Sequence, residues 1–456
     1  MLYSMQYAPW VFEKLPYVHH FAERGLPHLA DLRDPESRVV FIARRPMDPD
    51  VLTYQLRDVL GMTPAQERSA RERLIVSCPE EQGDGTLAEL ALADGDLVRR
   101  LRRLVGGAGR ARLSVFTAEA AADELGRLIG VTPSERSAPL ADRLGSKAGG
   151  KAIFDRAGVP SPRGGRQVLH SVAELTAVAR RMARNGPRQL MLKLDSPYWG
   201  SGLGNMTVDA ARLTSTGSIE RSVVEYTQPW EVFAAHVPVA GVIVEEHVPD
   251  VVRSLSSMAS VEEDGTVRVG PRYVQFLAAG YQYAGASFGG AGQPGPALKD
   301  VTAIGSVLAA EGYRGVFGLD FVERADGTFQ AIEINLRKVA SWHPVKHVEA
   351  ATGGHIDAVG DLRVDGERVA YVFRQALLPS HSALPSPSDV IGALRDKGLL
   401  YDRTTRRGAL LHLLGALSPC GYVEVTCVGD NLVDAGHRVD HVLAELHRTT
   451  TAPLYG

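Results

Sequence analysis

The chain has 456 residues, of which 45% are hydrophobic and 23% charged, and its formal net charge at pH 7 is −3. This length allows two or three domains with a substantial core, and the small negative charge argues against nucleic acid as a partner. Three cysteines without metal-ligand spacing argue against a disulfide scaffold and against a zinc site. No stretch approaches the ~20 apolar residues of a membrane span, so we expect a cytoplasmic protein without a membrane partner.

The N-terminal part of the chain alternates predicted strands with predicted helices. The strands are expected at residues 38–46, 73–80 and 113–116, and the helices at residues 86–105 and 117–130. Such alternation is typical of a small parallel α/β layer. An N-terminal α/β domain is therefore expected over residues 1–140.

A helix is predicted over residues 151–158, KAIFDRAG, and ends at Gly158, because glycine commonly closes a helix. Lysine is rare in this chain, with eight among the 50 lysines and arginines. Even so, Lys147 lies just before this helix, Lys151 begins it, and Lys193 occurs in the strand that precedes a glycine-rich loop. A compact ammonium charge at Lys147 and Lys193 is one interpretation, and chance clustering is the other. Lys151 is expected on the helix surface.

A second motif joins an apolar strand to a glycine-rich loop. The strand spans residues 189–194 and carries Lys193, and the loop contains Gly200, Ser201, Gly202 and Gly204. Glycine accepts backbone angles that are closed to other residues, so such a loop can fold its N–H groups around phosphate oxygens. The loop has neither the Gly-Lys-Ser/Thr of a Walker A loop nor the helix that follows a Rossmann fingerprint.

Two further segments follow this loop in the chain. The strand predicted at residues 241–248 turns polar at Glu245 and Glu246, which is typical of either a binding edge or a charged strand end at the surface. The segment at residues 285–300 is too rich in glycine for a regular element. It is expected to be either a mobile loop near the substrate site or an inert linker.

The most informative motif is a predicted β-hairpin over residues 315–335, with an Asp-Gly pair in its turn. Glu333 and Asn335 lie two apart on the second strand and point to the same face, which Asp320 on the first strand also reaches. Two carboxylates and an amide carbonyl are hard oxygen ligands of the kind that suit Mg²⁺. The alternative is a solvated outer face of an edge hairpin.

The chain after residue 359 reads as a C-terminal α/β module over residues 359–456. It includes a predicted strand at residues 422–429 and a helical segment at residues 434–448. No motif in this module indicates a chemical role, and a structural cap or a dimerisation module is the simplest interpretation.

Taken in this order, the motifs between Leu144 and Ala350 resemble the catalytic core of ATP-grasp enzymes. The run from Glu333, EINLRKVASWHPV, is similar to the biotin-carboxylase version of that core. The run Gly398–Gly429 resembles the C-terminal module of a subgroup that includes the peptide ligase of pheganomycin biosynthesis. The resemblance implies an α/β fold with α+β lobes, in which an ATP-grasp domain at residues 141–358 lies between the two flanking modules.

The resemblance also implies ligand-binding roles. The residues expected at the nucleotide are Lys147, Lys193, Ser201, Gly202, Gly204, Glu245, Glu246, Val248 and Asp250. The residues expected at Mg²⁺, with Mn²⁺ as a second option, are Asp320, Glu333 and Asn335. The chain departs from the family at the ribose, because the expected acidic position holds Val252 and only Asp250 lies close enough to serve.

Catalytic roles are expected for Lys193, Arg337, Ser341 and His343. Arg337 would fork onto the substrate carboxylate or the developing oxyanion. His343 would act as a base for the amine, although a His-Pro pair is equally a packing feature. A surface arginine is the alternative for Arg337.

These expectations lead to one main function and two alternatives. The main one is an ATP-dependent carboxylate–amine ligase that forms an amide through an acyl phosphate and joins an amino acid or its derivative to a peptide in antibiotic biosynthesis. The alternatives are a carboxylase of the biotin-carboxylase type and a non-catalytic ATP-binding regulator. The expected partners are small-molecule carboxylates with amines or peptides, and a homodimer is left open.

Overall fold

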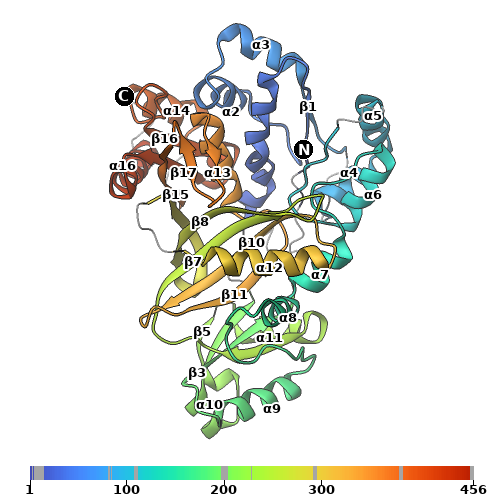
Figure 1. Cartoon of the computed structure of the whole chain (residues 1–456). Helices are drawn as coiled ribbons and strands as arrows, with labels where there is room; N and C mark the ends of the chain where they lie inside the picture. The colour runs from blue at the N-terminus through green and yellow to red at the C-terminus, as the bar shows by residue number, and fades with distance from the viewer. Residues whose placement is uncertain are drawn as a thin grey trace. The chain divides into compact units, whose positions relative to one another are not determined.

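The computed structural model describes residues 1–2, 4, 15–80, 83, 85–106, 111–196, 204–226, 228–290, 295–378 and 384–451. The chain forms two compact units (Figure 1). Unit 1 consists of Met1–Arg136, Gly285–Gln293 and Ala340–Gly456, and unit 2 of Ser137–Ala284 and Pro294–Val339. The first boundary lies close to the expected one at residue 140. The expected division into 1–140, 141–358 and 359–456 stays a prediction about module boundaries, because the compact units combine the two ends of the chain.

The N-terminal part of unit 1 contains the predicted parallel pair of strands. Its elements are η1 (Pro16–Arg33), β1 (Val39–Ile42), α2 (Pro49–Tyr54), η2 (Gln55–Val59), α3 (Pro64–Arg73), β2 (Leu74–Ser77), α4 (Leu87–Ala93), α5 (Gly95–Val105) and α6 (Ala120–Ile129). Strands β1 and β2 pair in parallel, which confirms the expected layer. The helix expected at residues 86–105 is two helices, because Asp94 caps α5 by accepting a hydrogen bond from the Leu97 N–H. The expected strand at residues 113–116 makes only isolated bridges.

The C-terminal part of unit 1 is built on an antiparallel sheet in the order β9-β15-β17-β16. Its elements are the end of β9 (Gln282–Phe288), α13 (Trp342–Thr352), β12 (His355–Ile356), β13 (Leu362–Val364), β14 (Glu367–Arg368), β15 (Ala370–Leu377), α14 (Pro387–Asp396), β16 (Gly408–His412), η5 (Leu414–Ala416), α15 (Leu417–Cys420), β17 (Tyr422–Gly429) and α16 (Leu432–Thr451). Helix α16 packs on β15 and β17. The predicted strand at residues 422–429 and the helix after it are confirmed.

The glycine-rich segment at residues 285–300 corrects one expectation. Its beginning is strand, the end of β9, and its last residues belong to α12 (Leu298–Ala310). A Cβ atom on Gly285 would lie 2.2 Å from the carbonyl oxygen of Phe373, and one on Gly289 would lie 1.9 Å from that of Val369. Gly285 is required because the backbone of β9 approaches its neighbour closely. The expectation of an irregular segment is therefore corrected at residues 285–288 and 298–300, whereas residues 291–294 lie outside the described residues.

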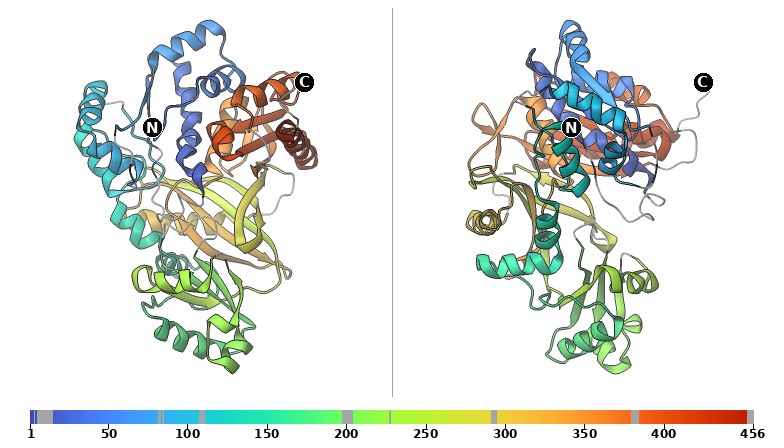
Figure 2. Two further views of the ribbon diagram at one scale, coloured as in Figure 1. Left: turned by 180° about the vertical axis from the view of Figure 1, so that it is seen from behind. Right: turned by 90° about the vertical axis from the view of Figure 1, so that its right-hand side faces the viewer.

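Unit 2 contains a four-stranded antiparallel sheet in the order β5-β4-β3-β6. The strands are β3 (Gln189–Leu194), β4 (Asn205–Asp209), β5 (Val223–Tyr226) and β6 (Val242–Glu246), and η3 (Glu220–Ser222) precedes β5. The helices α9 (Val172–Ala183), α10 (Ala210–Thr216) and α11 (Trp230–Ala240) accompany this sheet in the green part of the chain (Figure 2). Apolar side chains from the strands and these helices form one buried cluster, so the predicted strand that carries Lys193 is confirmed.

A second sheet in unit 2 carries the predicted hairpin. Its strands lie in the order β11-β10-β7-β8, followed by the beginning of β9. Their bounds are β7 (Val251–Val261), β8 (Val267–Ala278), β10 (Gly315–Arg324) and β11 (Phe329–Asn335), and η4 (Ala279–Tyr281) precedes β9. Helix α12 lies along β7 and β8, and α8 (Lys147–Ala157) packs against both α12 and β11 (Figure 1). Helix α7 (Ala138–Gly145) precedes α8. Gly158 closes α8 in the left-handed conformation, as expected.

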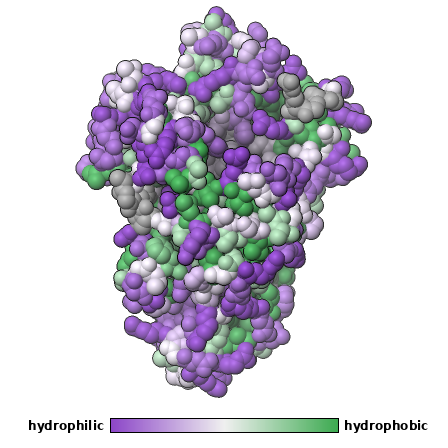
Figure 3. Space-filling view, in the orientation of Figure 1, coloured by the Kyte–Doolittle hydropathy of each residue, from purple (hydrophilic) through white to green (hydrophobic). Residues whose placement is uncertain are grey.

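The surface drawn in Figure 3 mixes hydrophilic and hydrophobic residues. The described part of the chain contains no helix with both the length and the apolar character that crossing a bilayer requires. The mixed α and β content confirms the expected fold class.

Candidate active site

The hairpin of β10 and β11 brings the three expected metal ligands together. Asp320 lies directly opposite Glu333 in the antiparallel register. The Asn335 Nδ2 donates a hydrogen bond of 3.1 Å to Asp320 Oδ2, and the Gln275 Nε2 on β8 donates one of 2.8 Å to Asp320 Oδ1. The predicted hairpin and the shared face are therefore confirmed. Gln275 was not expected, because it lies far from the motif in sequence.

The two facing carboxylates have opposite electrostatic surroundings. Burial, and then the negative charge of Glu333, raise the pKa of Asp320 to about 6. Burial also acts to raise the pKa of Glu333, but the nearby cations, Lys147 first, hold it below its ordinary value. Two carboxylates that raise each other's proton affinity are a poor arrangement unless a cation joins them. The pair therefore fits a divalent cation such as Mg²⁺, for which the Asn335 amide, whose Nδ2 faces Asp320 in this structure, would turn to present its oxygen.

The two lysines that the resemblance assigns to the nucleotide each form an ion pair with a carboxylate. The Lys147 Nζ lies 2.5 Å from Glu333 Oε1. The Lys193 Nζ lies 2.6 Å from Glu245 Oε1 and donates a weaker bond of 3.3 Å to the carbonyl oxygen of Ile332 on β11. Asp195, just after β3, accepts a hydrogen bond of 2.8 Å from the Ala148 N–H at the start of α8. This bond ties the strand that carries Lys193 to the helix that carries Lys147.

Lys151 is buried, which contradicts the expectation of a surface position. It is 2% exposed, its Nζ lies 2.7 Å from Glu245 Oε2, and the same Nζ donates a hydrogen bond of 2.6 Å to the Pro162 carbonyl oxygen. The sequence did contain a signal, because residues four apart lie on the same face of a helix. Since Lys147 faces the site from the first turn of α8, Lys151 faces it from the second.

The strand expected at the adenine ends in two glutamates with different roles. Glu245 is buried between Lys151 and Lys193, so it is not the surface residue of the alternative interpretation. Glu246 is half-buried and accepts a hydrogen bond of 2.9 Å from the Arg163 Nε. Beyond it, the His247 Nε2 lies 3.1 Å from the Tyr281 hydroxyl oxygen, a contact that the sequence did not indicate.

The remaining nucleotide residues are placed only in part. Val248 is half-buried, and Asp250 is exposed with a positive φ of 55°. Ser201 and Gly202 lie outside the described residues. Gly204 is described: its φ is 79°, which favours glycine, and its carbonyl oxygen accepts a hydrogen bond of 2.9 Å from the Leu194 N–H.

The expected catalytic residues after the hairpin fall into two groups. Arg337 is half-buried in unit 2, and its charge lowers the pKa of both Asp320 and Glu333. Ser341 and His343 belong to unit 1 and are each 1% exposed. The His343 Nε2 lies 2.7 Å from the buried Glu424 Oε2. This contact of His343 is that of a packing residue, and the catalytic roles of Ser341 and His343 stay predictions.

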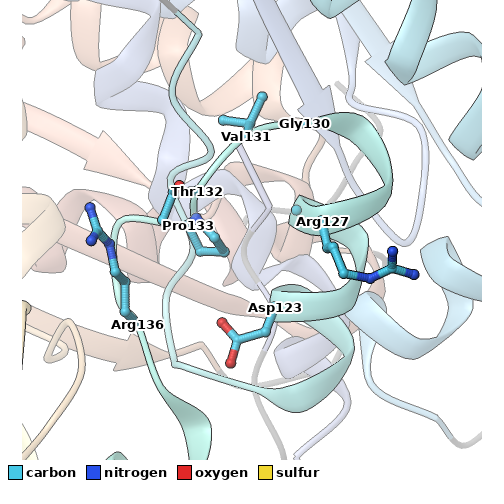
Figure 4. Close-up of a pocket in the computed structure, with 8 residues that line it drawn as sticks. Asp123, Arg127, Gly130, Val131, Thr132, Pro133 and Arg136 are labelled. Atoms are coloured by element: carbon cyan, nitrogen blue, oxygen red, sulfur yellow. The ribbon is translucent and has the colours of Figure 1, made fainter.

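A surface pocket of about 340 Å³ lies in unit 1 beside the end of α6 (Figure 4). It is lined by Asp123, Gly126, Arg127, Gly130, Val131, Thr132, Pro133 and Arg136. The guanidinium of Arg127 pairs with Glu124 at 2.5 Å. The lining includes none of the expected site residues, so this pocket is not part of the candidate active site.

Comparisons with known proteins identify a family model and a relative that covers most of the chain. The family described as the PGM1 C-terminal domain matches residues 389–440. The L-propargylglycine–L-glutamate ligase of Streptantibioticus cattleyicolor is 39% identical over 432 residues, which cover 94% of this chain and 89% of that protein. The alignment with this relative spans nearly the whole chain.

Two solved structures show the same fold at low sequence identity. The complex of biotin carboxylase from Campylobacter jejuni with β,γ-ATP has a TM-score of 0.58 and 13% identity, and covers 94% of this chain and 93% of that one. The biotin carboxylase domain of 2-oxoglutarate carboxylase from Hydrogenobacter thermophilus, a dimer crystallised with MgADP, ADP and bicarbonate, has a TM-score of 0.53 and 14% identity, and covers 93% of this chain and 87% of that one. At these identities the likeness concerns the fold alone.

Proposed function

The chain belongs to the family of ATP-grasp carboxylate–amine ligases that includes the L-propargylglycine–L-glutamate ligase, and from this premise we propose which residues carry the reaction and which substrates it joins. The observation that supports the proposal most is the cluster of Asp320, Glu333 and Asn335 beside Lys147 and Lys193. It combines ligands for a divalent cation with two ammonium groups, which is what a polyphosphate requires.

The chemistry begins with a carboxylate, which is a poor acyl donor because its leaving group would be oxide. A carboxylate oxygen attacks the γ-phosphorus of ATP, the bond to the bridging oxygen breaks, and ADP and an acyl phosphate result. An amine then attacks the acyl carbon, phosphate departs and the nitrogen loses a proton, which leaves an amide. Both steps need positioning and charge neutralisation more than covalent catalysis by the protein.

Asp320, Glu333 and Asn335 would hold Mg²⁺, with Mn²⁺ as a substitute. The bound ion would neutralise phosphate charge and orient the phosphate oxygens. Lys147 on α8 and Lys193 on β3 would neutralise further negative charge of the phosphates. Because Lys147 pairs with Glu333 at 2.5 Å, a cation on that carboxylate would release the ammonium for the phosphates.

The nucleotide base would lie along the end of β6. Glu245 and Glu246 close that strand and Val248 follows it, and the loop that ends at Gly204 would close on the phosphates. Asp250 is our candidate for the ribose hydroxyls, since it is exposed on a left-handed turn beside the strand end. Arg337 would hold the substrate carboxylate or the developing oxyanion.

We assign the substrates to the amino-acid class. The name of the relative pairs two amino acids, so the acyl donor here is proposed to be an amino acid or its derivative, and the acceptor an amino acid or a short peptide. This pairing fits a role in the biosynthesis of an antibiotic or a related natural product. A homodimer stays a prediction, for which the Hydrogenobacter thermophilus domain is a precedent; light scattering would test it.

The test combines Mg²⁺-ATP with a panel of amino acids, including L-propargylglycine and L-glutamate, and with short peptides. We expect ADP and phosphate together with a product that is lighter than its two parents by one water, detected by mass spectrometry. ADP release that depends on bicarbonate and not on an amine would support the carboxylase instead. Tight ATP binding without turnover across the panel would support the non-catalytic regulator.

A further inference from the structure

Two carboxylates in unit 2 form ion pairs with Lys147 and Lys193, the lysines proposed to bind the nucleotide, but the surroundings of the two carboxylates differ. Glu333 pairs with Lys147 and belongs to the proposed metal site. Glu245 pairs with Lys193 through one oxygen, at 2.6 Å, and with Lys151 through the other, at 2.7 Å. Lys193 and Lys151 therefore share one buried carboxylate, each through a different oxygen.

The charges explain why this difference matters. A metal ion at Glu333 would replace Lys147 as the partner of that carboxylate. Glu245 is 2% exposed and has no place among the metal ligands, so it needs a different cation if Lys193 is to leave it. An uncompensated carboxylate at this depth would be strongly unfavourable.

Lys151 is placed to be that cation. Its Nζ is fixed from two sides, by Glu245 and by the Pro162 carbonyl oxygen at 2.6 Å, and its side chain is 2% exposed. The side chain of Lys193 is 7% exposed, and its second partner is a carbonyl oxygen at 3.3 Å on β11, next to the metal ligand Glu333. Lys151 is thus the more firmly bound of the two, and Lys193 is the one free to change partner.

We propose that Lys151 is the permanent counter-ion of Glu245, and that its charge allows Lys193 to transfer from Glu245 to the phosphates of the nucleotide. This inference rests on the proposed function and names a positioning residue within that site. Lys151 touches neither nucleotide nor substrate in this scheme. It sets the strength with which Glu245 competes for Lys193.

The substitution Lys151→Met tests the proposal by calorimetric titration with ADP and with a non-hydrolysable ATP analogue in the presence of Mg²⁺. Without the Lys151 charge, Glu245 retains Lys193 more strongly, so both nucleotides are expected to bind about tenfold more weakly, which corresponds to the loss of one charge-assisted hydrogen bond. Adenosine carries no phosphate, so its affinity is expected to stay within about twofold.

A double-mutant cycle separates this effect from simple loss of packing. In the background Glu245→Gln, the carboxylate that competes for Lys193 is gone, so adding Lys151→Met is expected to change the ADP affinity by less than about twofold. Lys346→Met is the matched control, because its ammonium pairs with Glu349 in unit 1 and is 40% exposed. Thermal melting of every variant shows whether it is folded.

Each outcome decides one point. Equal ADP affinity in the wild type and Lys151→Met would overturn the proposal, as would an equal loss in the two backgrounds, which indicates a packing role. A parallel loss of adenosine affinity would overturn it too, because the defect would then lie at the base. If the wild type bound no adenine nucleotide at all, the proposed function itself would fail, which distinguishes the two failures.

Discussion

Replacing Glu333 with glutamine keeps the shape of the side chain and removes one of the two facing charges at the proposed metal site. The ion pair joins Glu333, which is 22% exposed, to Lys147, which is 5% exposed, so its loss should reduce the free energy of unfolding by about 2 kcal/mol. That is less than the 5–15 kcal/mol that a folded domain typically retains. The variant should therefore remain folded, with a melting temperature lowered by only a few degrees.

Catalysis should respond much more strongly than stability. Residues that merely orient a metal ligand change metal affinity by about 10- to 100-fold when they are replaced, so loss of a direct ligand should reduce amide formation by about 100-fold or more. A second effect is independent of turnover. Because the negative charge of Glu333 raises the pKa of Asp320, after burial, to about 6, the Asp320 pKa should fall towards its ordinary value in Glu333→Gln.

The assays are ADP release and amide formation against Mg²⁺ concentration, with carbon-13 NMR titration of the Asp320 carboxyl. Glu323→Gln is the matched control, since Glu323 lies on the same hairpin and pairs with Arg253 at 3.3 Å, with 13% exposure. It should retain wild-type activity. Near-normal activity of Glu333→Gln, or an unchanged Asp320 pKa, would refute the assignment of the metal site.

Three further predictions concern unit 1. In the wild type the Arg24 guanidinium lies 2.5 Å from Glu424 Oε1, and both side chains are buried. Glu424→Gln removes this counter-ion and should lower the free energy of unfolding by about 3–5 kcal/mol, measured by urea unfolding at pH 7; a loss below about 1 kcal/mol would contradict this. Burial lowers the pKa of His347 to about 3, so the unfolded chain binds its proton first and stability is lost as the pH falls below ~6.5, by about 2 kcal/mol at pH 5. His347→Gln should reduce this dependence between pH 7 and pH 5, while the buried His343 and His412, whose pKa values burial also lowers, keep part of it; an unchanged slope would argue against the prediction. Gly285→Ala places a Cβ atom 2.2 Å from the carbonyl oxygen of Phe373 and should lower the unfolding free energy by about 1–3 kcal/mol, which thermal melting would detect.

The hairpin was predictable because its signals are local. An Asp-Gly turn and an alternating strand specify the pairing of β10 with β11, and that pairing alone places Asp320 opposite Glu333. The same holds for the helix that ends at Gly158. In each case a few neighbouring residues contain the information.

The spacing of Lys147 and Lys151 indicates a shared helix face, but the partner of Lys151 was not predictable from its local sequence. Lys151 and Glu245 are distant in the chain and meet only through tertiary packing, and a charged residue is by default expected at the surface. The strand at Gly285 was missed for a similar reason, since the close approach that requires glycine is made by the distant Phe373. Local patterns indicate elements, whereas burial of charge and backbone approach depend on the assembled fold.

The chain passes between its two units four times, after Arg136, Ala284, Gln293 and Val339. On the ribosome, unit 2 is complete once Val339 has emerged, whereas η1 must wait for α13, against which it packs, and the sheet of unit 1 must wait for β17. At 5–20 residues per second, the first 136 residues wait roughly 15 to 60 s for the end of the chain. Unit 2 can therefore be completed on the nascent chain before the N-terminal segment meets its packing partners, and no simple truncation from either end yields unit 1 by itself.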